Sequence, residues 1–123
     1  MLNDGELTQK IIGAAMRVHR QIGSGFQEHI YHRALVLSLV EIGLKVETEK
    51  EFIVTFANKF VGKFRVDLVV ESQVIVELKS TAALISIHLT QTISYLKASG
   101  LEIGLLLNFG TRSLQIKRLA KFV

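Results

Sequence analysis

Residues 64–79 read FRVDLVVESQVIVELK, and most of the fold can be inferred from this stretch. Two runs rich in β-branched residues flank the polar triplet Glu71-Ser72-Gln73, a pattern typical of two strands joined by a tight turn. With a three-residue loop, Asp67 lies directly opposite Glu77 in an antiparallel hairpin, and cross-strand partners share a face. Lys79 is two residues further along and shares that face as well. The other face is then predicted to be an apolar core made of Phe64, Val66, Leu68, Val70, Val74, Val76 and Leu78.

The facing carboxylates need a compensating positive charge, because two carboxylates opposite each other repel. Lys79 is one source of that charge, and a bound divalent cation is another. Ligation by oxygen alone suits Mg²⁺ or Mn²⁺, and the chain has no cysteine that could hold a softer metal. The interpretation depends on the register, since a two-residue loop would place Asp67 and Glu77 on opposite faces.

Composition limits the class of protein. With 123 residues, 49% of them hydrophobic, we expect one domain spanning 1–123 with a substantial core. No apolar run approaches the roughly 20 residues needed to cross a bilayer, and the acidic segment 1–6 is unlike a signal peptide. We therefore expect a cytoplasmic protein without membrane contact. The net charge of +4 and the isoelectric point near 9.6 are compatible with an anionic partner such as nucleic acid.

Two helices are predicted before the hairpin. Apolar residues recur at helical spacing over 5–22, and Gly23 supplies a C-terminal stop. Ser24, with a glutamine three residues on, predicts the N-cap of a second helix that ends at Gly43. Glu28 falls in the first turn of that helix. Periodicity alone favours a surface residue there that stabilises the helix dipole.

The remaining segments predict a mixed sheet. Residues 45–56 alternate as a strand does, and a turn at 57–59 leads to the strand that contains Asp67. Residues 101–109 are nearly continuously apolar, which is typical of a strand covered on both faces, and 113–119 suit an edge strand.

A third helix is predicted to open at Ser80-Thr81 and to end at Gly100, with His88, Gln91 and Tyr95 on one face. The strand–helix–strand order implies a parallel pair with a right-handed crossover. The predicted class is thus α/β, with a mixed α+β sheet and helices packed on it.

Several motifs resemble a known family. Asp67 followed by Glu77-Leu78-Lys79 resembles the core motif of the PD-(D/E)XK nuclease superfamily. The segment Gly25-Phe26-Gln27-Glu28-His29-Ile30-Tyr31 resembles the signature of the GxxExxY family within that superfamily. Residues 88–97 and 104–110 are similar to that family too, so the resemblance covers roughly 7–122. It implies a restriction-endonuclease-like core, a central mixed sheet flanked by helices.

The resemblance also implies roles for individual residues. Asp67, Glu77 and the backbone carbonyl of Leu78 would hold Mg²⁺ or Mn²⁺, and Glu28 would be a further ligand, directly or through water. Lys79 would orient or help to deprotonate the attacking water, or stabilise charge on phosphorus. Residues that would support the site or touch nucleic acid are Gln91, Tyr95, His88 and Tyr31.

The implied function is hydrolysis of phosphodiester bonds in DNA, or less directly in RNA, by a metal-dependent nuclease. A second hypothesis is a catalytically silent domain that binds nucleic acid or protein and retains the fold. A third makes Glu77 and Lys79 an ordinary charge pattern on an edge strand. A homodimer is a further expectation, because so small a domain often needs a second subunit to hold a duplex.

Overall fold

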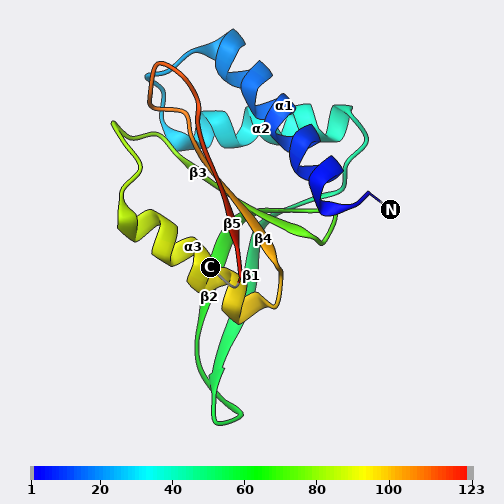
Figure 1. Ribbon diagram of the computed structural model, residues 1–123, viewed down its shortest axis with the longest axis vertical. Coiled ribbons are helices and arrows are strands. Elements are labelled where there is room, and N and C mark those ends of the chain that lie inside the picture. The colour runs from blue at the N-terminus through cyan, green and yellow to red at the C-terminus, as the bar shows by residue number, and fades with distance from the viewer. Residues whose placement is uncertain (1, 122–123) are drawn as a thin grey trace.

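The computed structural model describes residues 2–121, in which a five-stranded mixed sheet carries helices on both faces (Figure 1). In chain order the elements are α1 (Asp4–Ile22), α2 (Glu28–Glu41), β1 (Val46–Phe56), β2 (Lys59–Val70), β3 (Val74–Lys79), α3 (Ser86–Ser99), β4 (Ile103–Asn108) and β5 (Gln115–Ala120). The strand order is β1-β2-β3-β4-β5, so β1 and β5 are the edges. The predicted class, a mixed sheet flanked by helices, is confirmed.

The central hairpin has the predicted register. Val70 pairs with Val74 and Leu68 with Val76, which leaves the three-residue loop at 71–73. This register excludes the two-residue loop. It also places the next position along each strand, Asp67 and Glu77, side by side where the regular pairing of β2 with β3 ends.

The second half of the sheet is also as expected. β3 pairs in parallel with β4, and β5 pairs antiparallel with β4 on the outer side. Every residue of β4 is buried, in agreement with a strand covered on both faces. α3 packs closely on β4 at Gly104, since a Cβ there would lie 3.1 Å from Cγ2 of Thr92.

Two hydrophobic cores lie on the two faces of the sheet. The larger core packs α1 and α2 against one face, and its members include Leu68, Val76 and Leu78 from the hairpin. The smaller core lies under α3 and includes Val66, Val69 and Ile75. The hairpin is therefore buried on both sides near its turn, which fixes the orientation of the residues beyond it.

The predicted apolar face of β2 is wrong in one respect. Phe64 and Val66 belong to the core under α3, whereas Leu68 belongs to the core under α1 and α2. The alternation of side chains is broken between Val66 and Leu68, at Asp67. On the neighbouring strand, Glu49 has a φ of 50°, in the left-handed region, and it lies between two regular cross-strand pairs. This local departure from β geometry explains the switch of faces.

The helix ends are only partly as predicted. Gly43, at φ 85°, closes α2 in a Schellman motif, in which the N–H of Leu44 bonds to the carbonyl of Leu39. The expected capping box at Ser24 is wrong, because α2 begins at Glu28 with Gln27 as a cap that makes no side-chain hydrogen bond. Gly25, at φ 108°, holds the preceding residues in a loop instead.

The third helix begins later than the sequence predicts. Ser80-Thr81 does not open α3, which begins at Ser86. The side chain of Asn108, which is fully buried, bonds to both the N–H and the carbonyl of Thr81, at 3.0 and 3.1 Å. These bonds hold the backbone of Thr81 in a loop against β4. Gly110 permits the close approach, since a Cβ there would lie 2.4 Å from the Thr81 backbone.

Within residues 2–121, no helix combines the length and the apolar character that crossing a membrane requires.

Candidate functional site

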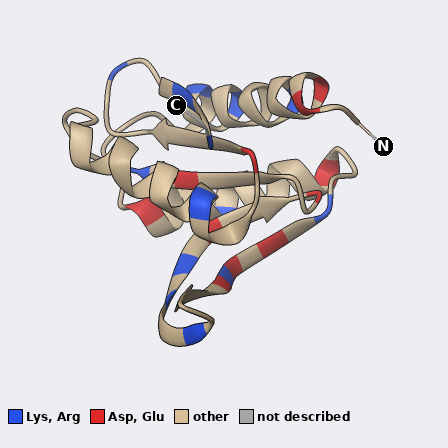
Figure 2. Cartoon of the chain, turned by 60° about the horizontal axis from the view of Figure 1, so that its bottom comes forward, with Lys and Arg blue, Asp and Glu red and all other residues tan. Residues whose placement is uncertain are grey.

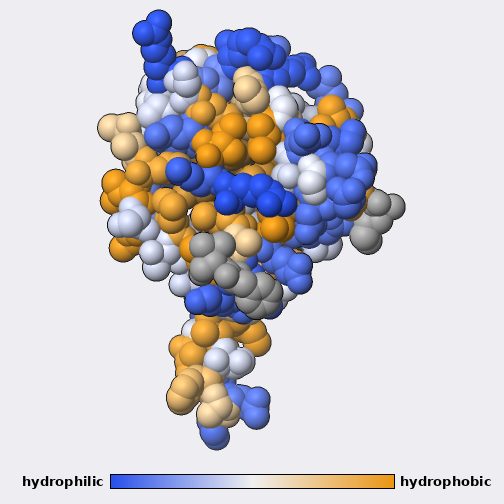
Figure 3. Space-filling model, viewed as in Figure 1, coloured by the Kyte–Doolittle hydropathy of each residue, from blue (hydrophilic) through white to orange (hydrophobic). Residues whose placement is uncertain are grey.

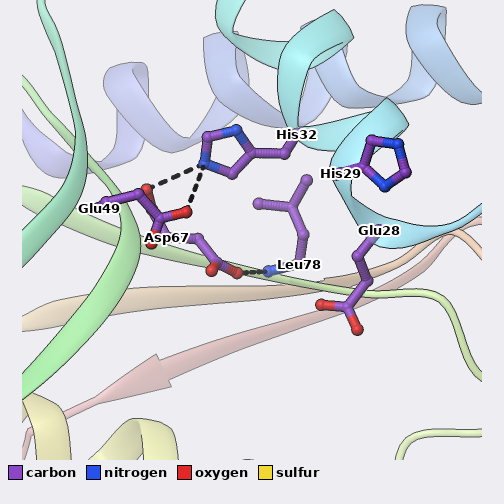
Figure 4. Close-up of a pocket in the computed structure, with 6 residues that line it drawn as sticks. All are labelled: Glu28, His29, His32, Glu49, Asp67 and Leu78. Atoms are coloured by element: carbon purple, nitrogen blue, oxygen red, sulfur yellow. Dashed lines mark hydrogen bonds and ion pairs between the residues drawn. The ribbon is translucent and has the colours of Figure 1, made fainter.

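The carboxylate of Asp67 is placed by the end of the hairpin. Its Oδ2 accepts a hydrogen bond of 2.8 Å from the backbone N–H of Leu78 (Figure 4). The carboxylate therefore bridges β2 and β3 just beyond Leu68–Val76, the last regular pair of the two strands. The backbone carbonyl of Asp67 is bound as well, at 3.2 Å from Nε2 of His32 on α2. Asp67 is thus held from the strand and from the helix above it.

Glu77 lies beside Asp67 and is buried, with a residue exposure of 6%. The pKa of Glu77 is raised from 4.5 to about 9, mainly by burial and then by the charge of Asp67 and a side-chain hydrogen bond with it. The positive charge of Lys79 acts in the opposite direction, as does a hydrogen bond with the Asp67 backbone. The structure therefore brings Asp67, Glu77 and Lys79 together at one point.

One oxygen of Glu77 has no hydrogen-bond partner in the part of the chain that the structure describes. Within residues 2–121, the buried Oε1 of Glu77 makes no hydrogen bond. A buried carboxylate oxygen without a donor costs free energy, because the water that it loses on folding is not replaced. A cation next to Asp67 and Glu77 would supply the missing interaction.

Tyr95 extends this group from α3. Burial, together with the charges of Glu77 and Asp67, raises the pKa of the Tyr95 phenol. Its ring stacks on Phe64 with a centroid distance of 4.4 Å and an interplanar angle of 8°. The structure thus places one of the residues on the predicted face of α3 next to the carboxylates.

Glu28 reaches the same region from α2. An open pocket of about 240 Å³ is lined by Glu28, His29, His32, Glu49, Asp67 and Leu78. Figure 4 shows Glu28 extending from the start of the helix toward the strands, with Leu78 between it and Asp67. Glu28 therefore faces a pocket that it shares with Asp67. A carboxylate in the first turn also suits the helix dipole, and the two roles are compatible.

His32 and Glu49 are pocket residues that the motif analysis did not select. Nε2 of His32 lies 3.8 Å from Oε1 of Glu49 and bonds to the carbonyl of Asp67. A sequence signal exists for His32, because it is four residues after Glu28 and so lies on the same side of α2. Glu49 gives no such signal, since its position depends on its left-handed backbone in β1.

The other predicted support residues have different environments. Tyr31 is fully buried, where its hydroxyl donates to the carbonyl of Gly23 at 2.6 Å and accepts from the N–H of Phe26 at 3.1 Å. It supports the loop before α2 and presents no surface to a ligand. Nδ1 of His88 accepts from the N–H of Ile85 at 3.2 Å, so His88 caps α3. Gln91 is exposed on α3.

Comparison with known proteins agrees with this geometry. The family model of the PD-(D/E)XK nuclease superfamily matches residues 5–119. The chain belongs to this superfamily. Among solved structures, the crystal structure of SSO0001 is similar, with a TM-score of 0.62 and 20% identity over 77% of this chain. The chain spans 50% of the length of that protein, and the likeness concerns the fold, which is restriction-endonuclease-like. No curated protein matches the sequence.

Nucleases of the PD-(D/E)XK superfamily generally use divalent metals, and the residues present fit such an ion. The part of the chain that the structure describes contains no group of three or more His, Cys, Asp or Glu side chains that could hold a metal ion. Mg²⁺, however, is usually bound through one or two carboxylates and keeps several waters. Asp67 and Glu77, whose Oε1 has no hydrogen-bond partner within 2–121, provide such a pair, and the donors are oxygens.

Proposed function

We propose that the protein is a metal-dependent nuclease that hydrolyses phosphodiester bonds in DNA. The observation that carries the proposal is the burial of Glu77 beside Asp67, with a carboxylate oxygen that has no hydrogen-bond partner among the described residues. Two such carboxylates destabilise a fold unless a cation binds them. Membership in a nuclease superfamily supports the same function. The motif at 25–31 supports the finer assignment to the GxxExxY family.

In this proposal Asp67, Glu77 and the backbone carbonyl of Leu78 hold Mg²⁺ or Mn²⁺. Glu28, which faces the shared pocket, is a further ligand, either directly or through a bound water. When bound, the cation supplies positive charge to the phosphoryl oxygen and lowers the pKa of a coordinated water.

The chain itself supplies the remaining groups. Lys79 lies next to Glu77, where its ammonium group orients the attacking water, helps to deprotonate it or stabilises charge on the phosphorus. The phenol of Tyr95 lies beside the same carboxylates, so it supports the site and contacts the nucleic acid. Gln91, four residues earlier and exposed on α3, is the more peripheral contact.

The proposal is tested by cleavage of a panel of DNA forms that includes single strands, duplexes, flaps and junctions. Purified protein is expected to cut at least one form in Mg²⁺ or Mn²⁺ and none in EDTA. Glu77→Ala is expected to lose most of the rate, whereas Glu41→Ala, an exposed glutamate on α2, serves as the matched control. An RNA panel tests the other nucleic acid. Binding without cleavage across both panels, unchanged by Glu77→Ala, would contradict the proposal and favour a non-catalytic binding domain.

A further inference from the structure

The hairpin formed by β1 and β2 extends beyond the rest of the molecule (Figures 1 and 3). We call its outer part, residues 52–66, the arm. Pairing continues to Phe56 and Lys59, so the strands are joined by the two-residue turn Ala57-Asn58. Both turn residues have positive φ, 51° and 63°, as in the tight turns that match the twist of a hairpin. The tip of the arm is therefore a tight two-residue turn.

The arm carries large apolar side chains that the fold does not bury. Phe56 is 75% exposed and Phe60 is 64% exposed, and both flank the turn. Val61 and Ile53 are 59% exposed each. Val61 is the extra residue of a bulge, because Val54 pairs with Gly62 and Thr55 with Phe60. Clustered exposed apolar residues of this kind mark a site of interaction rather than part of a core.

Charge identifies the class of partner. Residues 52–66 contain Lys59, Lys63 and Arg65 and no acidic residue, so the arm contributes +3 of the net charge of +4. The acidic residues of β1, Glu47, Glu49 and Glu51, lie toward the base of the hairpin, as Figure 2 shows. Lys63 lies 3.5 Å from Glu51, but both side chains are exposed and such pairs are weak. Lysines interspersed with phenylalanines suit a nucleic acid, whose phosphates and bases need these two kinds of group.

The arm is connected to the proposed active site by a row of aromatic rings. Tyr95, beside the carboxylates, stacks on Phe64 at 4.4 Å, and Phe64 stacks on Phe52 at 5.5 Å. Alternation along β1 places Phe56 on the same side as Phe52. A strand that leaves the carboxylates along this side of the hairpin therefore meets aromatic surface as far as the tip.

Whether the bound bases are paired or unpaired follows from how an aromatic ring binds nucleic acid. In a duplex the base faces are already stacked, and a ring reaches them only by unstacking a step, which costs a few kcal/mol. Unpaired bases offer their faces freely. We propose that the arm binds single-stranded segments of the substrate, with Phe56 stacked on an unpaired base and its cross-strand partner Lys59 on a phosphate. Phe60 pairs with Thr55 and therefore lies on the opposite face of the hairpin. This inference rests on the proposed function only in taking nucleic acid as the substrate.

The test is binding in EDTA, which separates the arm from cleavage. A fluorescein-labelled single strand of mixed sequence and the corresponding duplex are titrated with the full chain, and fluorescence anisotropy is measured. The single strand is expected to bind more tightly. The variant Phe56→Ser is expected to bind it about fivefold or more weakly. Phe60→Ser, on the opposite face of the arm, and Leu37→Ser, 67% exposed on α2, are expected to be unchanged. Lys59→Gln is expected to lower the salt slope by about 0.7.

Two results would overturn the inference. One is single-strand binding that Phe56→Ser leaves unchanged, or that this variant weakens only as much as it weakens duplex binding. The other is a dimer that the variant converts to a monomer in light scattering with unchanged affinity per subunit, which would make the arm a contact between copies. If binding depends on the arm but no DNA is cut, the inference stands and the nuclease proposal fails. If Glu77-dependent cleavage is found and the arm variants bind normally, the nuclease proposal stands and the inference about the arm fails.

Discussion

Replacing Glu77 by Gln tests whether the folded state disfavours the ionised form of this buried carboxyl group. Because the pKa of Glu77 is raised from 4.5 to about 9, the folded state favours the protonated form. The stability from this group is fully present below pH 4.5 and is lost as pH rises through 9. Glutamine has a similar shape and no proton to lose. The variant should therefore gain stability relative to the natural protein as pH rises through this window.

The size of the effect follows from the shift. One pKa unit corresponds to about 1.4 kcal/mol, so the 2.5 units between 4.5 and neutral pH correspond to about 3 kcal/mol. The full window to pH 9 doubles this to about 6 kcal/mol, an upper bound. Since domains of this kind are stable by roughly 5–15 kcal/mol, the difference is large enough to measure.

The assay is urea unfolding in EDTA for the natural protein and Glu77→Gln at a series of pH values from 4.5 to 9. The difference between the two unfolding free energies should rise steadily in favour of the variant, because other titrating groups cancel. Glu41→Gln, which changes an exposed glutamate, should show no such trend. A difference between Glu77→Gln and the natural protein that does not change with pH would refute the buried-acid interpretation. In Mn²⁺ the natural protein should be stabilised with release of a proton, and the variant should not.

Four further predictions concern neighbouring residues. Asp67→Asn should leave the apo fold intact or slightly more stable near neutral pH, since an amide oxygen can still accept a hydrogen bond from the N–H of Leu78. Calorimetric titration of this variant should find no Mn²⁺ binding. A marked loss of apo stability would indicate a structural ion pair between Asp67 and Lys79 instead. Lys79→Ala should lose most of the cleavage rate and Gln91→Ala less, with unchanged circular dichroism, and equal losses would contradict the roles proposed for them. Tyr31→Phe should lower the unfolding free energy by about 1–3 kcal/mol, because the N–H of Phe26 and the carbonyl of Gly23 lose their hydrogen-bond partner. Urea unfolding measures this change, and Tyr95→Phe is the comparison. Gly110→Ala should destabilise the loop after β3, detected as faster amide exchange around Thr81, and unchanged protection there would contradict the close approach.

Sequence reasoning succeeded where a local pattern determines the structure. The polar triplet at 71–73 set the register of the hairpin, and Leu68 pairs with Val76 as predicted. The apolar run that became β4 indicated burial on both faces. Glycines at the ends of helices predicted the stops at Gly23 and Gly43, because only local backbone geometry is involved there.

It failed where distant segments set the local geometry. The late start of α3 depends on Asn108, which lies 27 residues after Thr81 and binds its backbone. The switch of faces in β2 accompanies an irregular residue, Glu49, on the neighbouring strand. The role of Tyr31 in supporting the site stays a prediction, but its place in the core could not be inferred from the motif. Its ring stacks on Phe109 at 4.7 Å, from the other end of the chain.

The irregularity at Asp67 accounts for how the site is built. If the alternation of β2 continued unbroken, Val66 and Leu68 would share a face, and one of the two cores would lose a residue. Because the switch falls at Asp67, Val66 is anchored under α3 and Leu68 under α1 and α2, and the residue between them is held by both cores. Its carboxylate then accepts a hydrogen bond from the N–H of Leu78, in place of a backbone acceptor on the neighbouring strand. Hydrophobic packing on two faces therefore fixes the position of a charged group that would repel Glu77 if left to itself. The arrangement is stable only because the cores hold the residues on either side, and this rigidity is what a site for a small cation needs.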